Sequence, residues 1–171
     1  MRRCAWLFCC MACCFGVVDL FAQANEGETS AVGIKRMYES YKRSFPDVPD
    51  VSRADLLAKD DGLAVVFVDV RRAKEQAVSM IPGAITQKQF EAASTRYLGR
   101  KVVAYCTIGY RSGLYAKRLR AQGWDAFNLE AGILGWVHAG GDVEHDGSTT
   151  KRVHVYGKKW DLLPDGYESV R

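Results

Sequence analysis

The sequence contains no internal repeat and no low-complexity tract, so nothing in it supports a repeat architecture. Its formal net charge is only +4 over 171 residues, which is too mild to indicate a nucleic acid partner. A convincing metal-ligand pattern is also missing. The nearest approach is a group near the C-terminus whose spacing fits no zinc signature, namely His138, Asp142, Glu144 and His145. We therefore expect no metal, no cofactor and no nucleic acid partner.

Cysteine is scarce outside the first 24 residues. Five of the six cysteines lie in that segment, and the rest of the chain keeps only Cys106. Exported domains normally use their cysteines in pairs, as disulfides. An unpaired cysteine is therefore a candidate reactive thiol. The alternative is a buried structural cysteine that takes no part in chemistry.

The first 24 residues have the pattern of a secretory signal peptide. Residues 1–3 (Met-Arg-Arg) carry positive charge, residues 4–18 are almost entirely apolar, and residues 22–24 (Ala-Gln-Ala) form a typical cleavage sequence. We expect cleavage after Ala24 and an exported protein, periplasmic or secreted, with no stable membrane insertion afterwards. An uncleaved anchor is less favoured, because the apolar core is short for a span and Asp19 interrupts it. Acylation as a lipoprotein, at Cys13 or Cys14, is a further alternative.

The most informative stretch runs from residue 102 to residue 121. Residues 102–105 form an apolar run with the β-branched character of a buried strand. Residues 114–121 place apolar side chains at helical spacing, and Gly123 suits a helix C-terminus. Cys106 therefore lies where a strand ends, and the short loop of residues 106–112 leads into a helix.

This loop should stabilise negative charge. The unpaired amides of the first helical turn point into it, and the helix dipole adds partial positive charge. Arg111 contributes a full positive charge, and Gly109 allows the positive φ that a tight cradle needs. A thiolate on Cys106 would be favoured there. We also expect the Ser112 hydroxyl to cap the helix.

These residues resemble the active-site loop of rhodanese-type sulfurtransferases, which has a C-x-x-G-x-R-S pattern between a strand and a helix. Two further segments fit in the expected order. Residues 68–84 resemble the D-V-R-x-x-x-E and I-P-G-A signatures of the family, and residues 129–136 resemble its L-E-G-G-x-x-x-W segment. The resemblance covers about residues 50–140. It departs from the family pattern at Gln76, Ser79 and Met80.

The resemblance implies an α/β fold of the rhodanese-like type, with three layers and a central, mostly parallel sheet flanked by helices on both faces. Without residues 1–24 the chain has 22 basic and 19 acidic side chains, a net charge of +3, over 147 residues. That length suits one domain with a single core and some additional chain. We therefore divide the sequence into a signal peptide (1–24), an N-terminal linker and helix (25–49), a rhodanese-like domain (50–140) and a C-terminal arm packed on the domain (141–171).

Periodicity and turn residues predict the individual elements. The predicted helices are residues 32–41, 53–59 and 87–98. The predicted strands, besides the one before Cys106, are residues 63–68, 124–129 and, as a weak edge strand, 153–156. In open α/β sheets, sites gather at the carboxyl ends of the strands, where Cys106 is expected to lie.

The resemblance also implies roles for residues by position. Asp69, Arg71 and Glu75 would form a polar network that braces the loop, and Glu75 or Asp69 would pair with Arg111. Trp136 would either pack beside the loop or serve core packing alone. The rest of the loop would bind the substrate through its backbone amides, namely Thr107, Ile108, Gly109, Tyr110, Arg111 and Ser112.

Sulfur transfer is the activity that this resemblance implies. The Cys106 thiolate would attack the sulfane sulfur of a small donor such as thiosulfate and carry it as a persulfide. A thiol or cyanide acceptor would then remove the sulfur. A thiol-reductase partner could keep Cys106 reduced in an exported compartment.

Two alternatives are also compatible with the sequence. One is a low-turnover binding or sulfur-carrier module, because Thr107, Ile108 and Tyr110 make the loop less basic than thiosulfate users often have. The other is a phosphatase of the same fold. Those phosphatases have a longer C-x5-R loop, whereas Cys106 and Arg111 enclose only four residues, and we identify no general acid for a leaving group.

Overall fold

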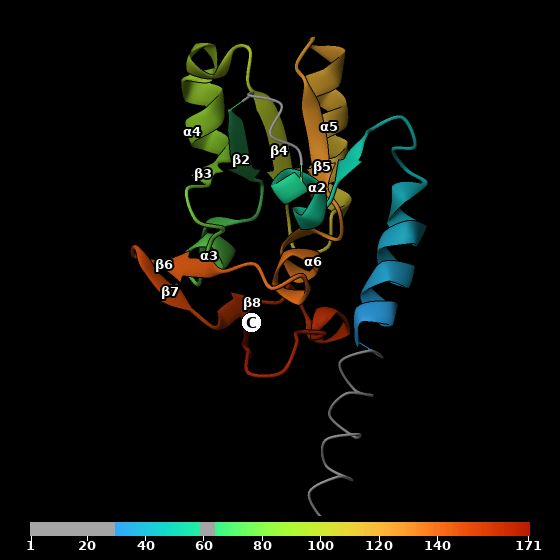
Figure 1. Ribbon diagram of the computed structural model, residues 1–171, viewed down its shortest axis with the longest axis vertical. Helices are drawn as coiled ribbons and strands as arrows, with labels where there is room; N and C mark the ends of the chain where they lie inside the picture. The colour runs from blue at the N-terminus through green and yellow to red at the C-terminus, as the bar shows by residue number, and fades with distance from the viewer. Residues whose placement is uncertain (1–29, 59–63) are drawn as a thin grey trace, which may run out of the picture.

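The computed structural model describes residues 30–58 and 64–171. At its centre is a five-stranded sheet with the order β1-β5-β4-β2-β3, in which all pairings are parallel (Figure 1). The strands are β1 (Asp50–Val51), β2 (Val65–Asp69), β3 (Ile85–Thr86), β4 (Lys101–Tyr105) and β5 (Ala126–Leu129). Strand β4, which ends immediately before Cys106, therefore lies in the middle of the sheet.

Helices cover both faces of this sheet. The N-terminal helix (helical over residues 30–42), α4 (Gln87–Ala92) and α5 (Tyr110–Ala121) contribute to one core. On the opposite face, α2 (Arg53–Ala58) and α6 (Gly132–His138) contribute to a second core. Successive side chains of a strand point to opposite faces, and Val102 belongs to the first core while Val103 belongs to the second. The predicted three-layer α/β fold is confirmed.

The C-terminal arm, residues 141–171, adds two small sheets at the end of the domain where α3 (Ala73–Gln76) also lies (Figure 1). Strands β6 (Val143–His145) and β7 (Ser148–Thr150) form an antiparallel hairpin, and β8 (Arg152–His154) pairs in parallel with β9 (Glu168–Val170). The arm is attached by a backbone bridge from Met80 to Glu144 and by the fully buried side chains of Val153 and Val155. The predicted edge strand at 153–156 is therefore shorter than expected and lies in its own two-stranded sheet.

The prediction of one helix over residues 87–98 is wrong. Helix α4 ends at Ala92, Ala93 leaves the helical region with φ −139°, and a short 3₁₀ helix follows (η1, Ser94–Tyr97). In a continuous helix, residues seven positions apart are separated by about 10 Å along the axis. The break instead lets Tyr97 stack on Phe90, with ring centroids 5.4 Å apart.

Four predicted features fall partly or wholly outside the described residues. The predicted signal peptide (1–24) lies wholly outside them, and so does the start of the predicted N-terminal linker (25–49). The last residue of the predicted helix 53–59 and the first residue of the predicted strand 63–68 belong to residues 59–63, which the structure does not describe. Within the ranges 30–58 and 64–171, the structure contains no helix of sufficient length and apolar character to cross a bilayer.

Candidate active site

The Cys106 loop is held at the carboxyl end of β4 by helix α6. The carbonyl oxygens of Cys106 and Thr107 accept hydrogen bonds from the amides of Ile133, at 2.8 Å, and Leu134, at 3.2 Å. Gly132 makes this close approach possible, because a Cβ atom there would lie 2.3 Å from the Cys106 carbonyl oxygen. These contacts direct both loop carbonyls toward α6 and away from the thiol.

The Cys106 sulfur faces the start of helix α5. Its Sγ accepts a hydrogen bond from the Gly109 amide, at a distance of 3.2 Å. Gly109 has a φ of +92° and is the N-cap of α5, so the amides of Tyr110, Arg111 and Ser112 belong to the first helical turn. Such amides have no acceptor within their own helix. The loop thus combines a thiol, a bound amide and the positive end of a twelve-residue helix.

Arg111 is paired with Glu75 and not with Asp69. Its Nη1 donates to Oε2 of Glu75 at 2.8 Å, and its Nη2 donates to Oε1 at 2.7 Å. The Thr107 hydroxyl donates to the same carboxylate at 3.1 Å. Burial alone would raise the pKa of Glu75, but the hydrogen bonds from Arg111 and from the Arg72 amide outweigh it and lower that pKa to about 2.

The charge of Arg111 is stabilised from two sides. Burial opposes its protonated form, but the hydrogen bond with Glu75 and the proximity of the Cys106 sulfur outweigh that cost and raise the pKa of Arg111. The ring of Tyr156, from the C-terminal arm, lies 5.2 Å from the guanidinium carbon. Arg111 is therefore a permanent cation beside the thiol.

Asp69 and Arg71 form a separate, fully buried pair below the loop. The Arg71 Nη2 atom donates to Oδ2 of Asp69 at 2.7 Å and also to the Ser79 carbonyl. The Arg71 guanidinium lies 5.6 Å from the ring centroid of Tyr105, the last residue of β4. The single network expected from Asp69, Arg71 and Glu75 is therefore two separate ion pairs, Arg71–Asp69 and Arg111–Glu75. Only the second pair contacts the Cys106 loop.

The prediction that Ser112 caps the helix is wrong. Helix α5 begins at Tyr110, so Ser112 is its third residue, and the N-cap Gly109 has no capping side chain. The Ser112 hydroxyl instead donates to Oδ1 of Asn128 at 2.7 Å. The Asn128 amide nitrogen donates to the Gly109 carbonyl at 3.1 Å and to the Tyr38 hydroxyl at 2.9 Å.

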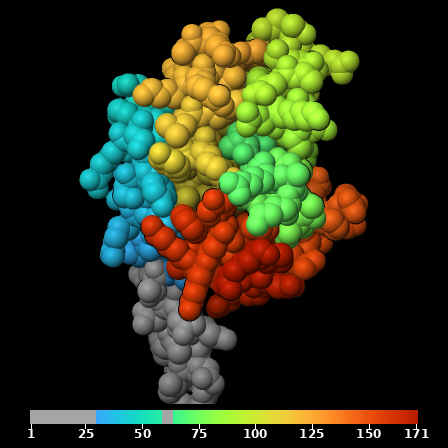
Figure 2. All heavy atoms as spheres, turned by 180° about the vertical axis from the view of Figure 1, so that it is seen from behind, coloured from blue at the N-terminus to red at the C-terminus, as the bar shows by residue number. Residues whose placement is uncertain are grey.

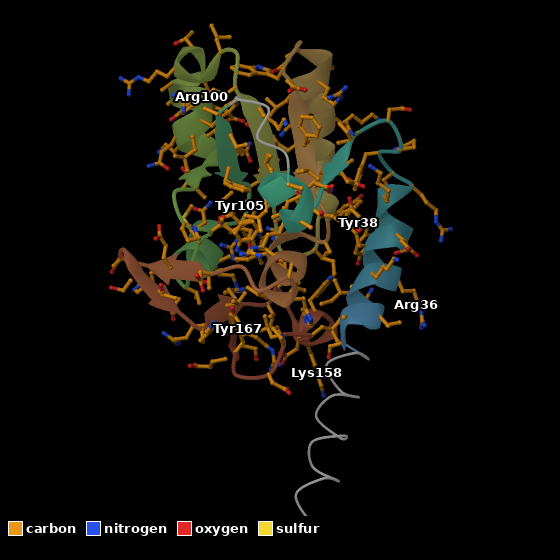
Figure 3. The ribbon with its side chains drawn as sticks, in the orientation of Figure 1. Arg36, Tyr38, Arg100, Tyr105, Lys158 and Tyr167 are labelled. Carbon is orange, nitrogen blue, oxygen red and sulfur yellow. The ribbon has the colours of Figure 1, made fainter. Side chains whose placement is uncertain are left out.

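Sequence reasoning missed Asn128 and Tyr38. The signal for Asn128 was a polar amide inside the predicted strand 124–129, and that side chain is fully buried. Tyr38 lies on the side of the N-terminal helix that faces the sheet, whereas Arg36 lies on its outer side (Figure 3). Its hydroxyl donates to Asp50, and its ring is so close to the loop that a Cβ atom on Gly109 would lie 2.5 Å from it.

Cys106 lines a pocket of about 340 Å³, although the residue itself is only 1% exposed. Four loop residues share this lining, namely Thr107, Ile108, Tyr110 and Arg111. The other three lining residues come from the two flanking segments, Tyr41 from the N-terminal helix and Tyr156 and Trp160 from the arm. The space-filling view shows the arm (orange-red) in contact with the N-terminal helix (blue) and the start of α5 (yellow) (Figure 2).

Trp136 does not line this pocket. Its ring packs edge-on against Phe67, with centroids 5.5 Å apart, and its Nε1 donates to the Asp142 carbonyl at 2.8 Å. The guanidinium of Arg53 lies 5.5 Å from the same ring. Its surroundings are those of core packing on the α2 and α6 side of the sheet.

The described residues contain no group of three or more His, Cys, Asp and Glu side chains arranged to hold a metal ion. Of the group considered above, His138 is engaged with the Leu162 carbonyl, at 2.7 Å from its Nε2. His145 lies 3.4 Å from the exposed carboxylate of Asp146.

The sequence model of the Rhodanese-like domain family matches residues 52–139, just over half of the chain. No curated protein matches the sequence. Among solved structures, a thiosulfate sulfurtransferase from Pseudomonas aeruginosa aligns with a TM-score of 0.51 and 24% identity, over 71% of this chain but only 25% of that one. This likeness shows a shared fold.

Two further solved structures align with this chain over nearly their whole length. A rhodanese-related protein from Thermoplasma volcanium aligns with a TM-score of 0.48 and 23% identity, over 56% of this chain and 97% of that one. A protein of unknown function from Rhodopseudomonas palustris, with "Possible Tyrosine Phosphatase" in its name, aligns with a TM-score of 0.49 and 28% identity, over 65% of this chain and 93% of that one.

Proposed function

The chain belongs to the rhodanese-like domain family, and on that premise we propose that it is a sulfurtransferase that carries sulfane sulfur on Cys106. The observation that carries the proposal is the position of the Cys106 sulfur, which lines a pocket and accepts a hydrogen bond from the Gly109 amide at 3.2 Å. A thiol that accepts a hydrogen bond from a backbone amide, at the N-terminus of a helix and beside a cation, suits a thiolate and, after the first transfer, a persulfide anion.

The first half of the cycle loads the sulfur. The Cys106 thiolate attacks the outer sulfur of a donor such as thiosulfate, a new sulfur–sulfur bond forms, and the bond within the donor breaks. Sulfite leaves with the electron pair of that bond. Cys106 is left as a persulfide anion, whose charge meets the loop amides and Arg111.

The second half returns the free thiolate. A nucleophilic acceptor, a thiolate or cyanide, attacks the terminal sulfur of the persulfide, and the electron pair returns to the Cys106 sulfur. The products are a new persulfide or thiocyanate. Neither half requires a separate general base, because the nucleophiles react as anions.

The test is the mass of the protein after incubation with thiosulfate. We expect a gain of one sulfur atom on the peptide that contains Cys106, no gain in the Cys106→Ser variant, and release of thiocyanate when cyanide is added. No sulfur on Cys106 with any sulfane donor would overturn the proposal and leave a non-catalytic binding module. Hydrolysis of an aryl phosphate that depends on Cys106 would support the phosphatase alternative instead.

We also propose that the protein is exported and cleaved after Ala24. Support comes from the signal-peptide pattern and from the fact that Cys106 is the only cysteine after that position. N-terminal sequencing of the protein from a periplasmic or secreted fraction should begin at Asn25. Recovery of an intact or lipid-modified N-terminus would contradict this cleavage.

A further inference from the structure

The walls of the Cys106 pocket are aromatic and come largely from outside the family domain. Tyr41, Tyr156 and Trp160 all lie beyond residues 52–139. Tyr41 contacts Tyr110 of α5, with ring centroids 5.2 Å apart at 48°. Tyr156 and Trp160 meet edge-to-face, also at 5.2 Å. The two segments that flank the domain therefore supply most of the ring surface around the thiol.

The pocket has little positive charge to offer a small dianion. Among the described residues that line it, Arg111 is the only charged one, and both of its terminal nitrogens are bound to Glu75. Arg72 and Lys159 lie 5.7 and 5.5 Å from the rings of Tyr156 and Trp160, but neither lines the pocket. Inside the pocket, the charge of Arg111 is therefore offset by that of Glu75.

The size of the pocket also exceeds what inorganic thiosulfate needs. Its volume of about 340 Å³ would hold roughly ten water molecules and falls in the lower range of small-molecule sites. Aromatic side chains favour contact with another ring, in stacked or edge-on geometry, beyond the gain from burying apolar area. The pocket thus has room and surface for an organic group next to the sulfur that reacts.

We propose that this pocket selects a sulfane-sulfur donor that carries an aromatic group and a single negative charge, of the arenethiosulfonate class, over the thiosulfate dianion. Tyr41, Tyr156 and Trp160 form the subsite for the ring. The inference rests on the proposed sulfurtransferase function. In the transfer step, the Cys106 thiolate takes the outer sulfur of the donor, the donor's sulfur–sulfur bond breaks, and an arenesulfinate leaves with the electron pair.

The experiment compares rates of Cys106 persulfide formation with benzenethiosulfonate, methanethiosulfonate and thiosulfate. Each rate is divided by the rate of the same donor with free cysteine, which removes differences in intrinsic reactivity. We expect the corrected rate for benzenethiosulfonate to exceed those of the other two by about tenfold, which corresponds to about 1.4 kcal/mol. NMR titration of the Cys106→Ser variant with the unreactive benzenesulfonate and methanesulfonate should show the same order of affinity, with benzenesulfonate bound more tightly.

Variants of Trp160 test whether the arm forms the subsite. Trp160→Ala should lower the corrected preference for benzenethiosulfonate about fivefold, in line with the loss of one aromatic contact. Trp160→Phe should retain most of the preference, since it keeps a ring. Trp124→Phe is the matched control, because Trp124 packs against Phe90 with ring centroids 5.1 Å apart and does not line the Cys106 pocket.

The outcomes separate this inference from the proposed function. If no donor loads Cys106, both are overturned. If thiosulfate loads Cys106 with a corrected rate equal to or above that of benzenethiosulfonate, sulfur transfer stands and the selectivity is overturned. A preference that is unchanged in Trp160→Ala would overturn the assignment of the subsite to the arm.

Discussion

Arg111 and Glu75 are joined by two parallel hydrogen bonds, at 2.8 and 2.7 Å, across 36 positions of sequence. The Glu75 side chain is completely buried, whereas that of Arg111 is 31% exposed. The pair connects α3 to the first turn of α5, and Thr107 bonds to the same carboxylate. One buried carboxylate therefore holds both the cation and a side chain of the Cys106 loop.

Replacing Glu75 with glutamine should destabilise the fold in a pH-dependent way. The pKa of Glu75 is lowered from 4.5 to about 2, which corresponds to about 3 kcal/mol of unfolding free energy. Because the folded pKa is the lower one, this contribution is complete above about pH 5 and is lost as the pH falls toward 2. Urea unfolding of both proteins across that range should show a difference that shrinks on acidification.

Glu39→Gln is the control for this prediction, since Glu39 is exposed on the N-terminal helix. It should change the unfolding free energy by less than about 0.5 kcal/mol at any of these pH values. A Glu75→Gln difference that stays constant between pH 5 and pH 2 would show that the carboxylate's charge is not what stabilises the loop.

Removing the guanidinium of Arg111 should slow sulfur loading. In Arg111→Ala, the rate of Cys106 persulfide formation should fall about a hundredfold, because a cation that meets developing charge is lost and Glu75 is left without its partner. Arg111→Lys should be intermediate, since an ammonium keeps the charge but not the two-point contact. Loading that proceeds at the original rate in Arg111→Ala would remove Arg111 from the mechanism.

A second variant separates these two causes. In the double variant Arg111→Ala with Glu75→Gln, the unpaired carboxylate is gone as well. Partial recovery of the loading rate relative to Arg111→Ala is expected if the Glu75 charge, no longer neutralised by Arg111, repels the thiolate. No recovery would indicate that the direct effect of the guanidinium dominates.

The sheet and the position of the loop could be predicted because their signals are local. The apolar run of residues 102–105 became β4, and the loop follows it as expected. The pairing of Arg111 was predicted only as a choice between two carboxylates. Asp69 was not available, because the side chain of Arg71, two residues away, already donates three hydrogen bonds to its carboxylate.

The surroundings of the loop could not be predicted, because they depend on how distant segments dock. Tyr38 lies 90 positions before its partner Asn128, and no periodicity in either segment relates the two. The contact between the Tyr156 ring and the Arg111 guanidinium likewise joins two segments that no sequence pattern relates. The misplaced cap at Ser112 has a different cause: Gly109 adopts a positive φ that starts α5 earlier than the apolar spacing indicates.

Asn128 should be important for stability, because one side chain serves three partners. In Asn128→Ala, the Gly109 carbonyl, the Ser112 hydroxyl and the Tyr38 hydroxyl each lose a hydrogen bond in a buried region. We expect the unfolding free energy to fall by about 3 kcal/mol, since a buried polar group left unpaired costs about 1 to 3 kcal/mol. Ser112→Ala alone should cost about 1 kcal/mol.

A double-mutant cycle checks this assignment. If Ser112 and Asn128 interact as the structure indicates, the effects of the two substitutions on urea unfolding should not add. Additive effects would mean that their contact contributes nothing to stability.

Access to Cys106 should depend on the arm. Tyr156 lines the pocket while Cys106 is only 1% exposed, so Tyr156→Ala should open a wider path to the sulfur. We expect a maleimide to alkylate Cys106 about threefold faster or more. Mass spectrometry of the Cys106 peptide measures this rate. Tyr167→Ala, also on the arm but not in the pocket lining, is the control and should leave the rate unchanged.

Gly109→Ala should disturb both the fold and the chemistry. Alanine at a φ of +92° is strained by about 1 to 2 kcal/mol, and its Cβ would in addition lie 2.5 Å from the Tyr38 ring. Gly99→Ala separates the two terms, because Gly99 has a similar φ of +75° and no atom of the described residues lies within 4 Å of the added Cβ. We expect Gly99→Ala to show the strain alone, with sulfur loading intact, and Gly109→Ala to lose more stability and to load slowly, since the amide that binds the Cys106 sulfur is displaced. Equal losses of unfolding free energy in the two variants would mean that the Tyr38 ring moves aside at no energetic cost and does not position the loop.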